Sequence, residues 1–253
     1  MRTFNNKTFT CVGINNTISI IRSKRFQIEK VLIIKDSKAS KNKRLNNALN
    51  SINRGLIQKV SDKKLSSSFK TQGVSITFSG NLIFDEIPNF EKNDHMCLLV
   101  LDRLEDPQNF GQIIRTAECA GINGIIYSTH HSVPLNETVL QVSQGAFVNM
   151  EFYEVTNIKN ELTKLKKNNF WIIGLENSAN ARPWYSIDYS GNTAIVFGSE
   201  GYGIRKKVLE ACDFIATIPM QGSTNSLNVS AAISAVIFEK LRQNLEKNNA
   251  FDT

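Results

Sequence analysis

The sequence predicts an α/β protein in two parts, a small basic α/β domain followed by a larger, doubly wound α/β domain with a parallel sheet. Strand-like apolar runs alternate with segments of helical periodicity along the chain. From residue 96 onward the runs are almost continuously apolar, which is typical of parallel strands buried on both faces. The net charge also changes sign between the two parts. We expect residues 1–79 and 96–253 to form the two domains and residues 80–95 to form the linker.

The positive charge of the chain is concentrated in its first third. Residues 1–80 contain 16 Lys or Arg and 3 Asp or Glu, a net charge of +13, whereas the remaining 173 residues contain 14 basic and 20 acidic side chains. Such an excess favours a polyanionic partner, because neutralised phosphates release their counterions. A lysine- and asparagine-rich composition that only solvates the surface is the alternative, but it would charge both parts alike. We therefore expect the first domain to contact nucleic acid.

Strands and helices can be assigned along both parts. In the first, apolar and β-branched runs predict strands at residues 9–14, 31–35, 56–60 and 74–78, and helical spacing predicts helices at residues 16–25 and 41–53. In the second, we expect strands at residues 97–102, 124–128, 170–176, 193–198 and 214–219. Helices are expected between and after them, at residues 110–120, 137–142, 158–168, 205–211 and 227–246. Residues 80–95 mix Gly, Pro, Asn and acidic side chains without a period, as linkers do.

Composition argues against a membrane, secreted or metal-binding protein. The longest apolar runs, such as residues 97–101 and 170–175, are too short to cross a bilayer, and the N-terminal segment lacks the apolar core of a secretory signal. The four cysteines form no CxxC pair, and the three histidines lack metal-ligand spacing. We expect a cytoplasmic protein with reduced thiols and no metal.

Polar residues gather in three segments at the expected carboxyl ends of strands, where open α/β sheets bind ligands. In residues 101–121, Asn109 and Arg115 lie on one helix, and the apolar neighbours of Arg115 predict that it is partly buried beside an anion.

The second segment, residues 194–207, is a glycine turn that fits neither a Walker loop nor a dinucleotide fingerprint. Glu200 within it is either a solvated carboxylate or the partner of Arg115. The third segment, residues 218–239, places Ser226 where a helix N-cap would stand, in a polar cluster richer than a cap needs.

Taken in order, these segments read NxxxxxRTAxxAG, GSEGxG and IPMxGxxxSLNVSxAxxxxxFE. Residues 96–243 thereby resemble the SpoU/TrmH family of the SPOUT methyltransferase superfamily. The resemblance implies a deep C-terminal trefoil knot, S-adenosyl-L-methionine as cofactor, and methyl transfer to a ribose 2′-hydroxyl of RNA. Relatives of this kind act as homodimers in which one subunit completes the site of the other.

The resemblance also implies roles for individual residues. The residues expected to bind the cofactor are Gly198, Glu200, Ile218, Met220, Leu227 and Asn228. The residues expected to act in catalysis are Asn109, Arg115, Glu200, Ser226 and Asn228. Because the pKa of a guanidinium is too high for a base, our hypothesis is that Arg115 orients the hydroxyl and stabilises its developing negative charge, while Asn109 and Glu200 hold the guanidinium.

The small preceding domain favours a particular substrate. Family members with this layout carry an L30e-like domain that helps bind rRNA, and they methylate a guanosine of 23S rRNA. Gly13-Ile14-Asn15 departs from the Gly-x-His stretch with which such domains often begin. A tRNA methyltransferase of the same family, a non-catalytic RNA-binding or ribosome-assembly protein, and more remotely a nucleotide-dependent oxidoreductase are the alternatives. A non-catalytic protein would be expected to lose motif residues, and all five catalytic candidates are present.

Overall fold

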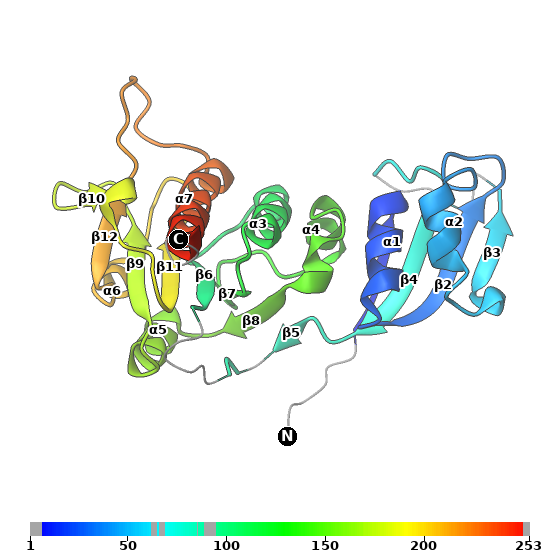
Figure 1. Cartoon of the computed structure of the whole chain (residues 1–253), viewed down its shortest axis with the longest axis horizontal. Coiled ribbons are helices and arrows are strands. Elements are labelled where there is room, and N and C mark those ends of the chain that lie inside the picture. Colours follow the sequence, from blue (N-terminus) through cyan, green and yellow to red (C-terminus); the bar gives the residue numbers. More distant parts are fainter. Residues whose placement is uncertain (1–6, 62–64, 66–68, 85, 89–94, 250–253) are drawn as a thin grey trace. The chain divides into compact units, whose positions relative to one another are not determined.

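The computed structural model describes residues 7–61, 65, 69–84, 86–88 and 95–249 (Figure 1). The chain divides into two compact units. The first comprises the residues up to Leu82 together with Leu135–Asn149, and the second comprises Ile83–Pro134 together with the residues from Met150 onward. Among the described residues, no helix combines the length and the apolar character needed to span a membrane.

The first unit is a four-stranded mixed sheet with helices. Its strands are β1 (Lys7–Val12), β2 (Gln27–Ile34), β3 (Ile57–Val60) and β4 (Val74–Gly80), in the order β1-β4-β2-β3 with only β2 and β3 parallel. Its helices are α1 (Ile14–Ser23), α2 (Lys43–Leu49) and α4 (Glu137–Val142), with the short 3₁₀ turns η1 (Arg54–Leu56) and η3 (Ala146–Asn149). The first strand ends at Val12, earlier than expected, because Gly13 adopts a φ of 94° and turns the chain into α1.

Helix α4 belongs to the first unit because it covers the free edge of β1. The backbone N–H of Thr10 donates to Glu137 Oε1 at 2.6 Å, and that of Val12 donates to Gln141 Oε1 at 2.8 Å. Gln141 Nε2 in turn donates to the carbonyl of Val12 at 2.9 Å. Glu137 and Gln141, one helical turn apart, thus bind backbone groups of two alternate residues of β1. As an edge strand, β1 would otherwise leave these backbone groups without hydrogen-bond partners.

The second unit is built on an eight-stranded sheet in which every pairing is parallel. Its strands are β5 (Ile83–Phe84), β6 (Cys97–Leu101), β7 (Gly124–Ser128), β8 (Glu151–Val155), β9 (Trp171–Leu175), β10 (Arg182–Pro183), β11 (Thr193–Phe197) and β12 (Phe214–Thr217). They lie in the order β10-β12-β9-β11-β6-β7-β8-β5. The helices are α3 (Pro107–Cys119), α5 (Ile158–Lys167), α6 (Lys206–Leu209) and α7 (Val229–Asn249), with the 3₁₀ turn η4 (Trp184–Ser186).

This architecture confirms the predicted α/β class with a parallel sheet. Strands β5, β8 and β10 were not predicted. β5 lies inside the expected linker, where Ile83 and Phe84 pair with Phe152 and Tyr153 of β8. Residues 80–95 therefore do not act only as a linker, because part of them extends the sheet.

Both faces of the sheet in the second unit are covered. Figure 1 shows α3 and α7 on one side of it and α5 with α6 on the other. The strands β6 and β11 are buried at every position. Alternate residues of each strand point to opposite faces, so a strand covered on both sides is apolar along almost its whole length. Polar groups can enter only where these strands end, and the candidate site lies there.

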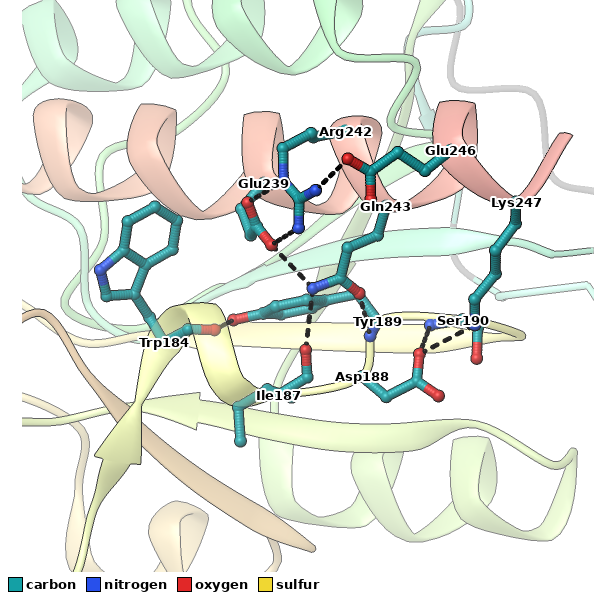
Figure 2. Close-up of polar contacts among 10 residues, drawn as sticks. All are labelled: Trp184, Ile187, Asp188, Tyr189, Ser190, Glu239, Arg242, Gln243, Glu246 and Lys247. Atoms are coloured by element: carbon teal, nitrogen blue, oxygen red, sulfur yellow. Dashed lines mark hydrogen bonds and ion pairs between the residues drawn. The ribbon is translucent and has the colours of Figure 1, made fainter. Parts of the chain in front are cut away.

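A polar network fastens α7 to the segment before β11 (Figure 2). Gln243 accepts from the N–H of Tyr189 at 3.0 Å and donates to the carbonyl of Ile187 at 3.0 Å and to Glu239 at 2.9 Å. Arg242 donates twice to the buried carboxylate of Glu239, at 2.7 and 2.8 Å. These hydrogen bonds from Arg242 hold the pKa of Glu239 below its ordinary value. Burial raises the pKa of Tyr189.

The lowered pKa of Glu239 predicts an acid-sensitive contribution to stability. A carboxyl whose pKa is lower in the folded state stabilises the fold above its unfolded pKa, and this contribution is lost as the pH falls through the folded value. We expect Glu239→Gln to lower the free energy of unfolding by about 1 kcal/mol at pH 7, a modest value because Arg242 is half-exposed. The difference from wild type should be smaller at pH 3 than at pH 7.

Urea unfolding at the two pH values measures this effect. Glu246→Gln is the matched control, because Glu246 pairs with the same arginine but is well exposed. Its effect should stay below about 0.5 kcal/mol at either pH. A loss for Glu239→Gln that is the same at pH 7 and pH 3 would contradict the assignment.

Candidate functional site

A cavity of about 620 Å³ lies at the carboxyl ends of β9, β11 and β12 in the second unit. Its walls come from residues 175–177, 197–201, 203, 216–218, 220 and 225–229, with Ala232 from the first turn of α7. This is the edge at which parallel α/β sheets bind ligands. All the residues expected to contact a cofactor line it, namely Gly198, Glu200, Ile218, Met220, Leu227 and Asn228. Ser226 lines it as well.

The turn after β11, which we call the glycine turn (residues 198–205), forms one wall of this cavity. It closes on itself through reciprocal backbone hydrogen bonds between Ser199 and Gly203, at 3.2 and 3.1 Å. A Cβ on Gly198 would lie 2.0 Å from the carbonyl carbon of Gly203. Gly203 itself has a φ of 65°, and a Cβ there would lie 2.4 Å from the carboxylate of Glu176. Both positions therefore require glycine.

Two carboxylates hold the far end of the glycine turn, and they follow β9 and β6, the two strands that flank β11. The N–H of Ile204 donates to Glu176 at 2.8 Å, and the N–H of Arg205 donates to Asp102 at 3.0 Å. The Arg205 guanidinium also donates to the carboxylate of Asp102, from Nε at 2.8 Å and from Nη2 at 2.7 Å. The side chain of Asp102 is fully buried, so this ion pair is shielded from water on the carboxylate side. Consecutive backbone amides are thereby pinned to the ends of β9 and β6.

Asp102, Glu176 and Arg205 were not singled out from the sequence. The positions of the two acidic residues in the sequence could have indicated them as site residues. Asp102 directly follows the apolar strand β6, and Glu176 directly follows the apolar strand β9. The carboxyl ends of parallel strands share one edge of the sheet. Which backbone groups they bind depends on how the glycine turn folds.

Three of the predicted catalytic residues meet in one cluster. Asn109 Nδ2 donates to Glu200 Oε1 at 2.6 Å, and Asn228 Nδ2 donates to Asn109 Oδ1 at 3.0 Å and to Glu200 Oε1 at 3.2 Å. Asn109 is buried in α3, Glu200 belongs to the glycine turn, and Asn228 precedes α7. The cluster thus joins three segments that are far apart in the sequence.

The N-cap of the last helix is Asn228, and the prediction of Ser226 was wrong. The Oδ1 of Asn228 accepts from the N–H of Ser230 at 2.9 Å, and its carbonyl accepts from the N–H of Ala232 at 3.0 Å. Helix α7 therefore begins at Val229 and not at residue 227. Ser226 lies in an exposed loop over residues 221–228. Asparagine caps as well as serine does, so the sequence alone offered two candidates two residues apart.

The prediction that Arg115 is partly buried beside Glu200 was also wrong. Arg115 is exposed on α3, and within the described part of the chain no hydrogen bond or ion pair of its guanidinium is found. It does not line the cavity of its own chain. Arg115 follows Asn109 by six residues on α3, and in an α-helix this spacing places their side chains about 120° apart around the helix axis. Arg115 therefore points away from the face on which Asn109 meets Glu200.

Comparison with known proteins identifies the family. The model of the SpoU rRNA Methylase family matches residues 96–238. The chain belongs to this family. The matched region of the SpoU family contains every residue of the Asn109–Glu200–Asn228 cluster, together with Arg115 and Ser226.

The relatives in the SpoU family differ in how much of their length aligns with this chain. The 23S rRNA (guanosine-2′-O-)-methyltransferase RlmB of Xylella fastidiosa is 34% identical, over 94% of this chain and 98% of its own length. A Staphylococcus aureus protein assigned to the TrmH family of tRNA/rRNA methyltransferases is 41% identical, but the chain matches only 61% of that relative's length.

A solved structure of the SpoU family shares the fold. The methyltransferase AviRb of Streptomyces viridochromogenes superposes with a TM-score of 0.81 at 19% identity, covering 95% of this chain and 91% of AviRb. AviRb has also been solved in complex with the cofactor AdoMet.

Proposed function

We propose that the protein transfers a methyl group from S-adenosyl-L-methionine to a ribose 2′-hydroxyl of RNA, with a guanosine of 23S rRNA as the favoured substrate. The cavity formed by the glycine turn at the carboxyl ends of β9, β11 and β12 carries this proposal. Membership of the SpoU family supports the reaction, and the AdoMet complex of AviRb supports the cofactor. The match to RlmB over almost the whole chain supports the RNA.

The residues of the cavity fit this cofactor. Its volume of about 620 Å³ lies within the range of small-molecule sites. Leu175, Phe197 and Ile218 offer apolar walls for an adenine ring, and the two crowded glycines bring main-chain groups close to the ligand. The carboxylates of Glu176 and Glu200 also line the cavity, and negative charge there suits a cationic cofactor. When bound, S-adenosyl-L-methionine supplies an electrophilic methyl group on a positively charged sulfur.

In this proposal the cluster of Asn109, Glu200 and Asn228 holds the glycine turn and the start of α7 in place. Arg115 orients the ribose hydroxyl and the adjacent phosphate and stabilises the negative charge that develops on the attacking oxygen. The hydroxyl oxygen would bond to the methyl carbon as the sulfur–methyl bond breaks, and the sulfur would keep that electron pair and leave as a neutral thioether. The hydroxyl proton would pass to a phosphate oxygen or to water, because a guanidinium cannot accept it.

The location of Arg115 favours a homodimer. Since Arg115 is exposed and does not line its own chain's cavity, a second copy would have to supply it there. Phe238 and Leu245 are exposed on α7, 44% and 54% respectively, and offer apolar surface for a subunit contact.

Three further features belong to the proposal. A trefoil knot is supported by membership of the SpoU family. An L30e-like, RNA-binding role of the first domain is supported by its charge of +13. A cytoplasmic location is supported by the four cysteines, all of which are free.

Mapping of 2′-O-methyl groups by mass spectrometry in rRNA and tRNA, from cells with and without the protein, tests the function. We expect one methyl group of 23S rRNA to disappear and to return with the wild-type gene. Arg115→Lys should retain roughly one hundredth of the activity or less, because the planar fork is lost. Arg182→Lys is the matched control at another exposed arginine of the second unit and should act as wild type.

The outcomes separate the alternatives. A methyl group missing from tRNA would keep the chemistry and overturn the substrate. No change in either RNA would favour a non-catalytic RNA-binding protein. Full activity of Arg115→Lys would exclude the role given to that arginine.

A further inference from the structure

Tyr202 is the most exposed large apolar side chain of the described structure. Its exposed fraction is 92%, against 58% for Tyr185 and 53% for Trp171. It stands in the glycine turn between Gly201 and Gly203, whose φ angles are 85° and 65°. Because the ring is almost entirely in water, it contributes no hydrophobic burial to the stability of its own chain.

The position of Tyr202 links it to the cavity. Ser199, Glu200, Gly201 and Gly203 all line the cavity, whereas the ring of Tyr202 does not. The ring therefore projects to solvent from a segment that forms the cavity wall. The other three exposed aromatic residues of the described structure differ in this respect. Trp171 begins β9 at the opposite edge of the sheet, Tyr185 lies in η4, and Phe238 lies on α7.

The backbone that carries Tyr202 is held on both sides. Before it, Glu200 is bonded to Asn109 and Asn228, and after it the amide of Ile204 is bonded to Glu176. Ser199 and Gly203 close the turn around it. In the described part of the chain the ring itself has no stacking or hydrogen-bonding partner. An aromatic group whose backbone is fixed and whose faces are free is preorganised to stack on a ligand.

We propose that Tyr202 stacks on a base of the RNA substrate next to the ribose that is methylated. The inference rests on the proposed function. A ribose that reaches the cavity must leave its helical neighbours, and the unstacked base then needs a new partner for its face. Aromatic side chains provide such a partner for any base. The ring would thus hold the target nucleotide, while the cavity behind the turn holds the cofactor.

Substitutions at position 202 test the stacking directly. Tyr202→Phe keeps the π face, Tyr202→Leu keeps apolar bulk without it, and Tyr202→Ala removes both. The substrate is 23S rRNA purified from cells that lack the protein. We expect kcat/KM for this RNA to fall roughly tenfold or more in the Leu and Ala variants and to stay near wild type in the Phe variant. Tyr185→Ala is the control at an exposed tyrosine away from the cavity and should have no effect.

Two further measurements on the same variants exclude other roles. The Kd for S-adenosyl-L-methionine, from calorimetry, should change less than about twofold, because the ring does not line the cavity. The molar mass from light scattering should not change.

Several outcomes would overturn the inference. A Leu variant as active as the Phe variant would show that no stacking occurs. A parallel loss of cofactor affinity would assign Tyr202 to the cofactor site, and a change in molar mass would assign it to a subunit contact. If wild type neither binds S-adenosyl-L-methionine nor methylates rRNA, the proposed function fails and this inference fails with it. If wild type is active and Tyr202→Ala is equally active, the stacking role of Tyr202 is refuted while the proposed function stands.

Discussion

Gly198→Ala is expected to weaken the binding of S-adenosyl-L-methionine roughly hundredfold or more, while the chain still folds. The added Cβ would lie 2.0 Å from the carbonyl carbon and 2.2 Å from the carbonyl oxygen of Gly203. Both are backbone atoms, so no side chain can rotate to relieve the clash. The turn would have to separate, breaking the hydrogen bonds between Ser199 and Gly203 that shape the cavity wall. Calorimetric titration of the cofactor measures the loss, and circular dichroism checks the fold.

Gly191→Ala is the matched control for this substitution. Gly191 has a φ of 73°, and a Cβ there would meet nothing within 4 Å. Its replacement introduces backbone strain of about 1 kcal/mol but no clash, and it lies outside the cavity. We expect normal cofactor affinity and a small drop in melting temperature. Equal cofactor affinity in the Gly198 and Gly191 variants would show that the glycine turn does not form the binding site.

Asp102→Asn is expected to lower the free energy of unfolding by about 3 kcal/mol. The carboxylate of Asp102 is fully buried and binds both the backbone N–H and the guanidinium of Arg205. Asn at this position is neutral, so the Arg205 guanidinium would lose its counter-charge. The side-chain amide N–H groups of Asn would also face the N–H groups of Arg205, which are donors themselves. The value lies at the lower end for buried ion pairs because the Arg205 side chain is 38% exposed.

Urea unfolding at pH 7 measures the Asp102→Asn effect. Lys164→Gln serves as the control, because Lys164 is 68% exposed and its pair with Glu161 should contribute less than about 0.5 kcal/mol. Because Asp102 also pins the glycine turn, cofactor affinity should fall together with stability. A loss below about 1 kcal/mol would mean that the buried pair does not hold the turn.

Local sequence was sufficient for the main elements of the fold. The largely apolar runs of β6 and β11 predicted buried parallel strands, and the structure confirms that every position in them is buried. The short strands β5 and β10 were missed because two residues carry no readable period. β8 was missed because its run, EFYEV, includes two glutamates. Such strands are recruited by pairing with neighbours that the chain supplies elsewhere.

The resemblance to the SpoU/TrmH family also predicted residues that surround the cavity. Polar and glycine residues after apolar strands indicated the ligand edge, and Gly198, Ile218 and Asn228 do line the cavity there. The partners of these residues could not be predicted in the same way. Glu200 was expected to meet Arg115, and it bonds instead to Asn109 and Asn228.

Local sequence patterns are enough to predict the α/β class, the parallel sheet and the edge at which ligands bind, because these features depend on burial patterns that repeat along a few residues. The folded structure was needed to show that Leu135–Asn149 joins the first unit, that Asp102 and Glu176 hold the glycine turn, and that Arg115 faces solvent. Each of these depends on a pairing between residues far apart in the chain. A hydrogen bond is satisfied by any suitably placed donor, so the choice among donors is made by packing and not by sequence spacing.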